Sequence, residues 1–304
     1  METGLIFPSA GGIAGAALAA PLLSGVINRT KAVFAGRQGQ PLLQAYHDII
    51  KLLGKGAVYS RTTTWVFRAG PIIQFSCAAL ALALLPMGFQ PALLAFPGDF
   101  ICLAGLLALM RFFLMTAALD TGSSFEGMGA SREAAFSALA EPVFLLSLAV
   151  LARLTGALSL SGMASRLALH PAEGSGPVLV LTTLALFVVL LAENARVPVD
   201  DPNTHLELTM IHEVMALDHG GPDLAFIQYA AQLKLWIMGI LVVNALGLGG
   251  RGGWACAGGM AALAVLIGIV ESTMARLRLL RVPQLMIGAG ALSLLALLLT
   301  LVRP

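Results

Sequence analysis

The sequence predicts an all-α fold, namely a polytopic integral membrane protein of about eight transmembrane helices with one amphipathic helix at the membrane interface. Hydrophobic residues make up 58% of the 304 positions and charged residues only 11%, whereas ordinary soluble domains have roughly 25% charged residues. The apolar residues come in runs near the ~20 residues that a helix needs to cross a ~30 Å hydrocarbon core. A soluble fold would have too few charges to cover its surface, so we expect the chain to lie in a membrane.

The apolar runs define the expected spans, which together form a single transmembrane domain over residues 1–304. The spans are expected at residues 5–27, 69–87, 100–119, 134–154, 177–193, 224–248, 254–272 and 284–301. Pro97 followed by Gly98 predicts a break or kink before the third span. The polar loops on one side are expected at about 28–68, 120–133, 194–223 and 273–283.

The basic residues indicate which side of the membrane the loops face. Most of the 18 lysines and arginines fall in these polar loops, and the opposite side carries Arg153, Arg166, Arg251 and Arg303. Because cytoplasmic loops are enriched in Lys and Arg, we expect the polar loops to face the cytoplasm and both termini to lie on the outer, periplasmic side of the inner membrane. No basic residue precedes the first span, the reverse of a cleavable signal peptide, so we expect that span to be retained.

A second helical pattern lies in the first polar loop, at residues 40–53. Apolar side chains recur there at helical spacing at Leu42, Leu43, Tyr46, Ile49, Ile50 and Leu53. This spacing predicts an amphipathic helix. Such a helix either lies in the membrane interface or packs beneath a partner subunit, and the sequence leaves both possibilities open.

The three cysteines and the net charge restrict the classes of ligand. Cys77, Cys102 and Cys256 stand alone in apolar segments without a CxxC pair or a nearby histidine, so we expect buried structural thiols. We therefore expect no iron–sulfur cluster, metal or other cofactor in this chain. The net charge of +2 gives no indication of a nucleic-acid partner.

Ionisable residues inside the expected spans are the first candidates for function, because charge is expensive in a membrane. Glu141 lies about two turns into the fourth span and is followed by Pro142, which leaves a backbone carbonyl one turn earlier without its usual partner. Arg111 and Lys234 lie deep in the third and sixth spans, and Glu193 ends the fifth. These residues either take part in ion coupling or pair with one another to hold the helices together.

The loop after the fifth span is unusually rich in titratable groups. Six of the 16 acids and three of the five histidines fall between residues 200 and 223. They are Asp200, Asp201, His205, Glu207, His212, Glu213, Asp218, His219 and Asp223. Pro202 and its neighbours predict a turn and a helix start, and the seven-residue spacing of the histidines would place them on one face of a longer helix. The spacing does not match a zinc helix; it favours a proton-exchanging funnel, a docking surface for a charged partner, or both.

Three motifs in order along the chain resemble the family of the H subunit of respiratory complex I. They are residues 41–48 with Lys51, residues 127–141, and residues 191–200 with Glu207 and Leu208. The last loop resembles more closely the membrane anchors of formate hydrogenlyase and hydrogenase-4, which are energy-converting [NiFe] hydrogenases. It carries Asn203, Thr204 and His205 where quinone-reducing relatives have more glutamates, and this difference argues against a quinone chamber.

The resemblance implies a membrane subunit that docks a hydrophilic electron-transfer arm and couples it to proton or sodium translocation. It assigns Glu141 and Glu193, with Arg132 and Arg196 beside them, to the start of a lateral ion pathway, and it places Asp200 and Glu207 facing the arm. The implied partners are [NiFe] hydrogenase large and small subunits, iron–sulfur subunits, antiporter-like membrane subunits and lipid, with the [NiFe] centre and the Fe–S clusters in those partners. The alternatives are a quinone-site subunit of a complex I-like NADH/quinone oxidoreductase, a stand-alone transporter and a purely structural anchor.

Overall fold

Eight long helices make up most of the fold. The computed structural model describes residues 3–88, 90–169, 175–200 and 211–302, and in these ranges the regular structure is helical apart from one isolated β-bridge between Met87 and Gln90. The long helices are α1 (Thr3–Phe34), α3 (Trp65–Ala83), α4 (Asp99–Asp120), α5 (Ser124–Thr155), α7 (Gly176–Glu193), α8 (Gly221–Ala245), α9 (Gly253–Thr273) and α10 (Val282–Val302). Each is long and apolar enough to cross a membrane, which confirms the predicted all-α, eight-span fold.

Shorter helices join the spans. The amphipathic helix expected in the first polar loop is α2 (Gln44–Leu53), none of whose residues is buried. A ten-residue helix, α6 (Leu160–Leu169), follows α5 and was not predicted. It is too short to span a bilayer. Three 3₁₀ turns complete the described structure: η1 (Glu213–Ala216), η2 (Gly249–Arg251) and η3 (Leu279–Arg281).

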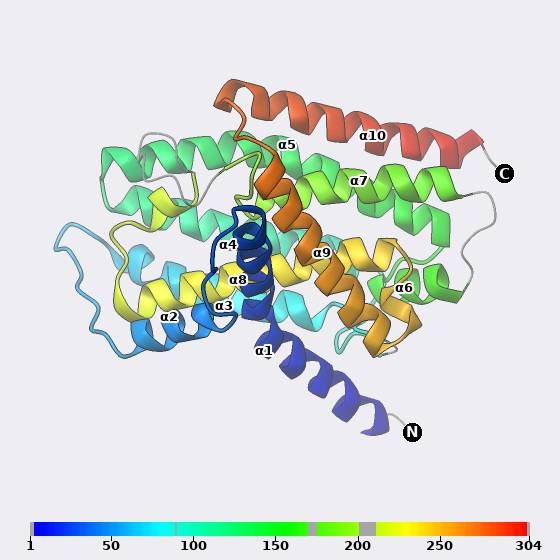
Figure 1. Cartoon of the computed structure of the whole chain (residues 1–304), viewed down its shortest axis with the longest axis horizontal. Helices are drawn as coiled ribbons and strands as arrows, with labels where there is room; N and C mark the ends of the chain where they lie inside the picture. The colour runs from blue at the N-terminus through cyan, green and yellow to red at the C-terminus, as the bar shows by residue number, and fades with distance from the viewer. Residues whose placement is uncertain (1–2, 89, 170–174, 201–210, 303–304) are drawn as a thin grey trace.

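The long helices are arranged as two packed groups crossed by a helix pair. Helices α5, α7 and α10 pack together, α3 packs on α4 and α8, and α1 packs on α9. Figure 1 shows α1 and α9 inclined across the other helices, and it shows both termini toward the same end of the bundle. The opposite end, where α2 and η1 lie, carries the polar loops and is called the polar end below.

The ends of the helices follow from local chemistry. Gly98 has φ 90°, a left-handed conformation, and α4 begins at the next residue, so the break predicted at Pro97 and Gly98 is confirmed. Glycine adopts this conformation without the penalty that a side chain would incur. Thr64 caps α3, and Asp120 at the end of α4 accepts hydrogen bonds from the backbone N–H groups of Thr64 (2.7 Å) and Phe67 (3.3 Å). These contacts tie α3 and α4 together at the polar end.

The polar loop expected at residues 120–133 is mostly helical, so that prediction was wrong. Helix α5 begins at Ser124 and runs for 32 residues, about 48 Å at 1.5 Å per residue, which exceeds the ~30 Å hydrocarbon core. Gly129 reflects close packing more than a loop, because a Cβ at this position would lie 2.2 Å from Cγ1 of Val214 in η1. The polar first turns of α5 thus continue the span toward the polar end.

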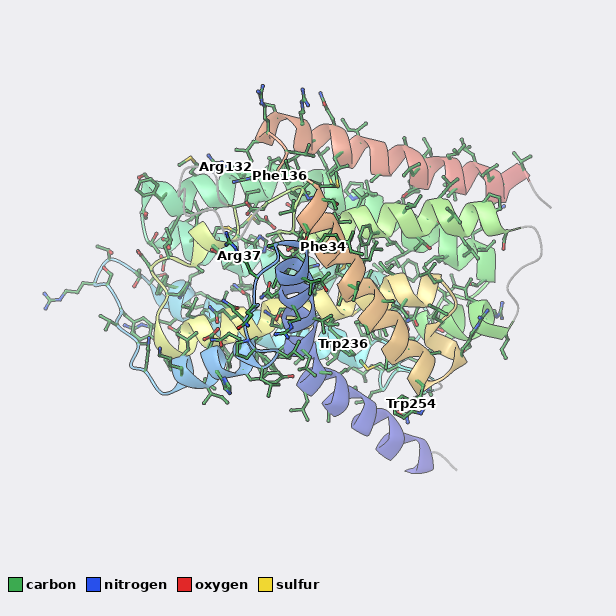
Figure 2. All side chains as sticks on the ribbon, viewed as in Figure 1. Phe34, Arg37, Arg132, Phe136, Trp236 and Trp254 are labelled. Carbon is green, nitrogen blue, oxygen red and sulfur yellow. The ribbon has the colours of Figure 1, made fainter. Side chains whose placement is uncertain are left out.

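The outer surface has the properties expected of a protein in a bilayer. Trp254 at the start of α9 is 94% exposed and points away from the bundle (Figure 2), as tryptophans do at a membrane–water interface. Cys77 and Cys256 are buried, as predicted, but Cys102 is exposed. The prediction for Cys102 was wrong because an apolar sequence cannot distinguish a residue that faces lipid from one that faces other helices.

Candidate functional site

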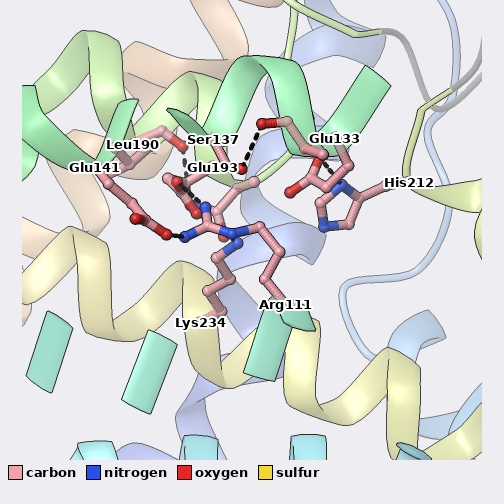
Figure 3. A network of polar contacts seen from close by, with 10 residues as sticks. Arg111, Glu133, Ser137, Glu141, Leu190, Glu193, His212 and Lys234 are labelled. Atoms are coloured by element: carbon pink, nitrogen blue, oxygen red, sulfur yellow. Dashed lines mark hydrogen bonds and ion pairs between the residues drawn. The ribbon is translucent and has the colours of Figure 1, made fainter. Parts of the chain in front are cut away.

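Four charged side chains form a continuous row of ion pairs inside the bundle (Figure 3). Arg111 on α4 lies at the centre, with Nη1 2.5 Å from Oε1 of Glu193 at the end of α7. Its Nη2 donates to Oε1 of Glu141 on α5. The second oxygen of Glu193, Oε2, lies 2.8 Å from Nζ of Lys234 on α8. The row therefore connects α5, α4, α7 and α8 through alternating negative and positive charges.

The row is buried at its centre and more accessible at one end. The side chains of Arg111, Glu193 and Lys234 are 4%, 8% and 5% exposed, whereas that of Glu141 is 45% exposed. Burying a single charge is costly, and pairing with an opposite charge offsets this cost. Alternating pairs therefore permit four charges inside a membrane helix bundle, and each of them is positioned by its neighbours.

A second acid–base pair continues from this row toward the polar end. Glu133 lies on α5, two turns before Glu141, and its Oε2 is 3.4 Å from Nδ1 of His212. Glu133 is 6% exposed. Carboxylates, imidazole and the lysine amine can all gain or lose a proton, whereas an arginine guanidinium stays protonated. Arg111 can thus act as a fixed charge between groups able to carry protons.

Two cavities meet at the Arg111–Glu193 pair, because both residues line both cavities. The polar cavity, of about 80 Å³, is also lined by Lys234 and His212, among other residues. The lateral cavity, of about 250 Å³, is lined by Glu141 and apolar residues of α4, α5 and α8. The ion pair therefore lies between a cavity with several charged and amide side chains in its wall and one whose wall is almost entirely apolar apart from Arg111, Glu141 and Glu193.

A further cluster holds the start of the loop that follows α7. Glu271 near the end of α9 has a fully buried side chain, with Oε2 2.7 Å from Nζ of Lys31 on α1 and Oε1 3.3 Å from Nη1 of Arg196. Asp200 is 3% exposed. Its Oδ1 lies 3.1 Å from Nη2 of Arg276, and its Oδ2 accepts a hydrogen bond from the backbone of Ile211 (3.0 Å). The loop is thus fixed to α1 and α9 at its start.

Aromatic contacts hold the end of the same loop. His219 is 4% exposed and stacks on Phe67 of α3, with ring centroids 3.9 Å apart and an interplanar angle of 6°. Burial lowers the pKa of His219 to about 4, because the charged imidazole loses its hydration. The imidazole of His219 is therefore neutral near neutral pH. Nearby, burial and a hydrogen bond to Asp223 raise the pKa of Tyr59.

The structure brings together some of the predicted site residues and separates others. Glu141, Glu193 and Lys234 lie in one row, and Arg196 lines the polar cavity beside it. Arg132 lies more than two turns before Glu141 on α5, and its guanidinium donates to Sδ of Met128 (2.9 Å).

The predicted loop residues occupy several different environments. Glu213 and Asp218 are exposed at the polar end, while Asp200, His219 and Asp223 are buried. Asp201, His205 and Glu207 lie outside the described residues. The expected helix with a shared histidine face was wrong for His212 and His219, because the described residues between them form only the short 3₁₀ turn η1. A turn of four residues cannot align side chains seven positions apart.

The sequence interpretation omitted some residues of these clusters. Glu133 lies eight positions before Glu141, a spacing that puts both on one helix face. Glu271 lies inside a predicted span, where an acid is a candidate by default. Gln74, a neutral residue that lines the polar cavity, gave no signal in the sequence. Across the described ranges, no group of three or more His, Cys, Asp and Glu side chains is placed to hold a metal ion.

The fold and the buried ion pairs define a multi-pass membrane protein with a charged path through its helix bundle. The family model described as NADH dehydrogenase matches residues 11–301, so the chain belongs to the NADH dehydrogenase family, the one that includes the H subunit of complex I. The resemblance inferred from the three sequence motifs is therefore confirmed.

Individual relatives are subunits of hydrogenase and respiratory complexes. The chain is 34% identical to formate hydrogenlyase subunit 4 of Escherichia coli (strain K12), over 88% of this chain and 89% of that protein. It is 33% identical to hydrogenase-4 component C of the same organism, over 73% and 69% respectively. A chain of the membrane-bound sulfane sulfur reductase, an archaeal respiratory membrane complex, superposes with a TM-score of 0.83 at 19% identity, covering 98% of this chain and 99% of that one. This last likeness shows a shared fold.

Proposed function

We propose that this chain is the membrane subunit of an energy-converting hydrogenase complex of the formate hydrogenlyase type. In this role it docks a hydrophilic electron-transfer arm at the polar end and couples electron transfer to ion translocation. The single observation that carries the proposal is the row from Glu141 through Arg111 and Glu193 to Lys234 in a chain 34% identical to a formate hydrogenlyase subunit.

The ion row supports a coupling role because a change in the protonation of one member changes the charge that its neighbours face. A proton placed on Glu193 would neutralise the anion that faces both Arg111 and Lys234. Arg111 would then keep Glu141 as its anionic partner. An event at the polar cavity can in this way alter the charge balance beside the lateral cavity, which is what coupling between an arm and a neighbouring ion-translocating subunit requires.

The polar end supports the docking role. Exposed acids there, such as Asp218, lie on a loop fixed at its start by the Asp200–Arg276 pair and at its end by the His219–Phe67 stack. A surface held on both sides can present charges to a partner at little entropic cost. By the positive-inside rule the polar end faces the cytoplasm, and both termini face the outer side of the inner membrane.

The proposed partners carry the redox chemistry. They are [NiFe] hydrogenase large and small subunits and iron–sulfur subunits at the polar end, and antiporter-like subunits within the membrane. A second candidate function is the quinone-site subunit of a complex I-like oxidoreductase, favoured by the match to the NADH dehydrogenase family over residues 11–301. In that case the polar cavity would adjoin the quinone site.

Purification of the tagged chain in a mild detergent, with metal analysis and mass spectrometry of the proteins that accompany it, tests the proposal. We expect nickel and iron, a hydrogenase large subunit, and hydrogen evolution from reduced viologen. Flavin with quinone reduction and no nickel would contradict the hydrogenase assignment and support the second candidate.

A charge-reversed variant tests docking separately. Asp218→Lys is expected to weaken retention of the arm while the membrane subunits stay together, because like charges across an interface repel. Arg251→Glu, at the opposite end of the bundle, reverses another exposed charge and serves as the control. Equal loss of the arm in both variants would contradict docking at the polar end.

A further inference from the structure

We infer that Arg278 and Arg281, in the turn before α10, bind the phosphate of an anionic phospholipid whose acyl chains lie along the exposed face of α10. This helix lies at one edge of the bundle and packs against α5 and α7 (Figure 1). The inference is independent of the proposed coupling and docking roles, because α10 carries none of the residues on which those roles rest.

The exposed face of α10 has the properties of a surface that contacts lipid chains. Only 22% of its most apolar stretch is buried, whereas every other candidate span is buried over 33% or more of the corresponding stretch. The exposed fractions of Ile287, Leu294, Leu298 and Leu301 lie between 49% and 63%. The helix contains no Asp, Glu, Lys or Arg. Hydrocarbon can therefore cover this face without leaving a charge in the membrane.

The hydroxyl groups of α10 are already bonded within the protein. The Ser293 hydroxyl is buried and hydrogen-bonds that of Ser147 on α5 (2.8 Å), and the Thr300 hydroxyl donates to the carbonyl of Leu297 (2.6 Å). The α5 face differs, because it carries the half-exposed Glu141, and a carboxylate facing hydrocarbon is costly. Lipid is thus a suitable neighbour for α10, whereas the α5 face needs a polar one.

Two exposed arginines lie where α10 enters the membrane. Arg278 precedes the turn η3 and Arg281 ends it, and Leu280 between them is 87% exposed. None of the ion pairs among the described residues includes either arginine. A guanidinium binds a phosphate through two parallel N–H donors, and anionic lipids attract basic residues beside a span. The headgroup of such a lipid would therefore supply the negative charge that these arginines lack.

Contacts beneath the turn hold the two arginines in place. The backbone N–H of Arg281 donates to the carbonyl of the other arginine (2.7 Å), and that of Leu277 donates to the carbonyl of Pro198 (2.9 Å). Arg276 also pairs with the buried Asp200 at 3.1 Å. A site that is ordered before its ligand binds loses less conformational entropy on binding. The turn is therefore prepared to hold a phosphate between two fixed positive charges.

Lipid is favoured over an acidic protein because the arginines lie next to apolar surface. Met274, in the same connection between α9 and α10, is 48% exposed, and Leu280 is exposed between the arginines. A phospholipid carries its negative charge and its apolar chains in one molecule. An acidic surface in the cytoplasm would pair with the arginines but leave the apolar face of α10 uncovered.

Photo-crosslinking in the whole complex identifies what contacts α10. A benzophenone amino acid replaces Ile287, about 9 Å along the helix from Arg281. The purified complex is placed in vesicles with equal amounts of anionic phosphatidylglycerol and zwitterionic phosphatidylethanolamine and irradiated, and the adducts of this chain are identified by mass spectrometry. Since each basic residue favours an anionic lipid by about fivefold, we expect roughly twentyfold more phosphatidylglycerol adduct. Equal adducts of the two lipids, or an adduct with a partner subunit in place of lipid, would overturn the inference.

Variants without the charges test whether the two arginines cause the selectivity. Arg278→Gln combined with Arg281→Gln should bring the two adducts to nearly equal amounts, while the total lipid adduct stays the same because the apolar face is unchanged. Lys55→Gln combined with Arg61→Gln is the matched control, since it removes two exposed charges from the loop between α2 and α3. It should keep the wild-type ratio. Wild-type selectivity without the two arginines, or the same loss in both variants, would overturn the assignment.

Discussion

Arg111 and Glu193 meet across α4 and α7 with 2.5 Å between Nη1 and Oε1, and this contact forms part of the wall of both cavities. An arginine remains charged at any physiological pH, so its effect on its two acids depends on their protonation and not on its own. The pair therefore separates the polar cavity from the lateral one while leaving the acids free to respond to protons.

A substitution at the exposed end of the row should lower ion translocation while leaving the buried pairs at its centre in place. Glu141→Gln removes the half-exposed acid, whereas Arg111 keeps Glu193 as its partner. Because Arg111 keeps a second anionic partner in Glu193, no buried charge is left unpaired, and we expect the free energy of unfolding to fall by less than the roughly 3–5 kcal/mol typical of a broken buried pair. Ion translocation should nevertheless fall, since the lateral cavity loses one of its two acids and keeps only Glu193. Thermal unfolding and vesicle assays on the same preparation check both statements, and a large loss of stability would indicate a helix staple instead.

The cluster around Glu271 should contribute strongly to stability. Glu271→Gln leaves Lys31 and Arg196 without their buried carboxylate, and we expect a loss of roughly 2–4 kcal/mol, below the upper range for a broken buried pair because Lys31 is 23% exposed. The change is measured by thermal unfolding of the purified complex. In a Glu271→Met, Lys31→Met double variant, apolar packing should restore part of the loss, and a further additive decrease would contradict the ion-pair account.

The buried His219 should make the free energy of unfolding depend on pH. Its pKa is about 4 in the fold and near 6.5 when unfolded, so the unfolded chain binds more protons between these values. The contribution, up to roughly 3 kcal/mol, is therefore fully present above about pH 6.5 and is lost as the pH falls toward 4. His219→Phe keeps a ring against Phe67 and should unfold at nearly the same temperature at pH 5 and pH 7.

The exposed His47 provides the comparison for this measurement. His47→Gln should retain the wild-type decrease in unfolding temperature at low pH. If His219→Phe retained it as well, the acid sensitivity would have to come from other groups.

The amphipathic helix α2 should lie in the membrane interface. Leu42, Leu43, Ile50 and Leu53 are all about half-exposed or more, and the Tyr46 hydroxyl donates to the backbone of Leu18 in α1, which holds the helix against a span. A nitroxide placed by Ile50→Cys, in a Cys102→Ser background, should be relaxed by oxygen dissolved in lipid, because an apolar face inserts among lipid chains. Protection from oxygen that appears only in the assembled complex would favour a partner subunit.

The sequence was sufficient to predict the spans, because the length and apolar composition of a segment indicate a membrane span whichever helices it packs against. It was also sufficient to single out Glu141, Glu193 and Lys234, since an ionisable group in a span is conspicuous by itself. It could not predict that Arg111 joins two acids or that Lys31 pairs with Glu271, because these contacts depend on which helices pack side by side. The helical start of α5 was missed because Gly129 was interpreted as a loop residue, whereas its packing against Val214 requires the absence of a side chain.

The coupling role is tested most directly by Glu193→Gln in the complete complex, reconstituted in proteoliposomes, with ion translocation and hydrogen evolution measured together. Asp48→Asn, which removes an exposed carboxylate on α2, is the control. Because Glu193 pairs with both Arg111 and Lys234, we expect the ions moved per hydrogen evolved to fall by about tenfold or more, the effect of roughly 1.4 kcal/mol on the rate-limiting transfer. Ion translocation at the wild-type ratio with undiminished hydrogen evolution would contradict the account.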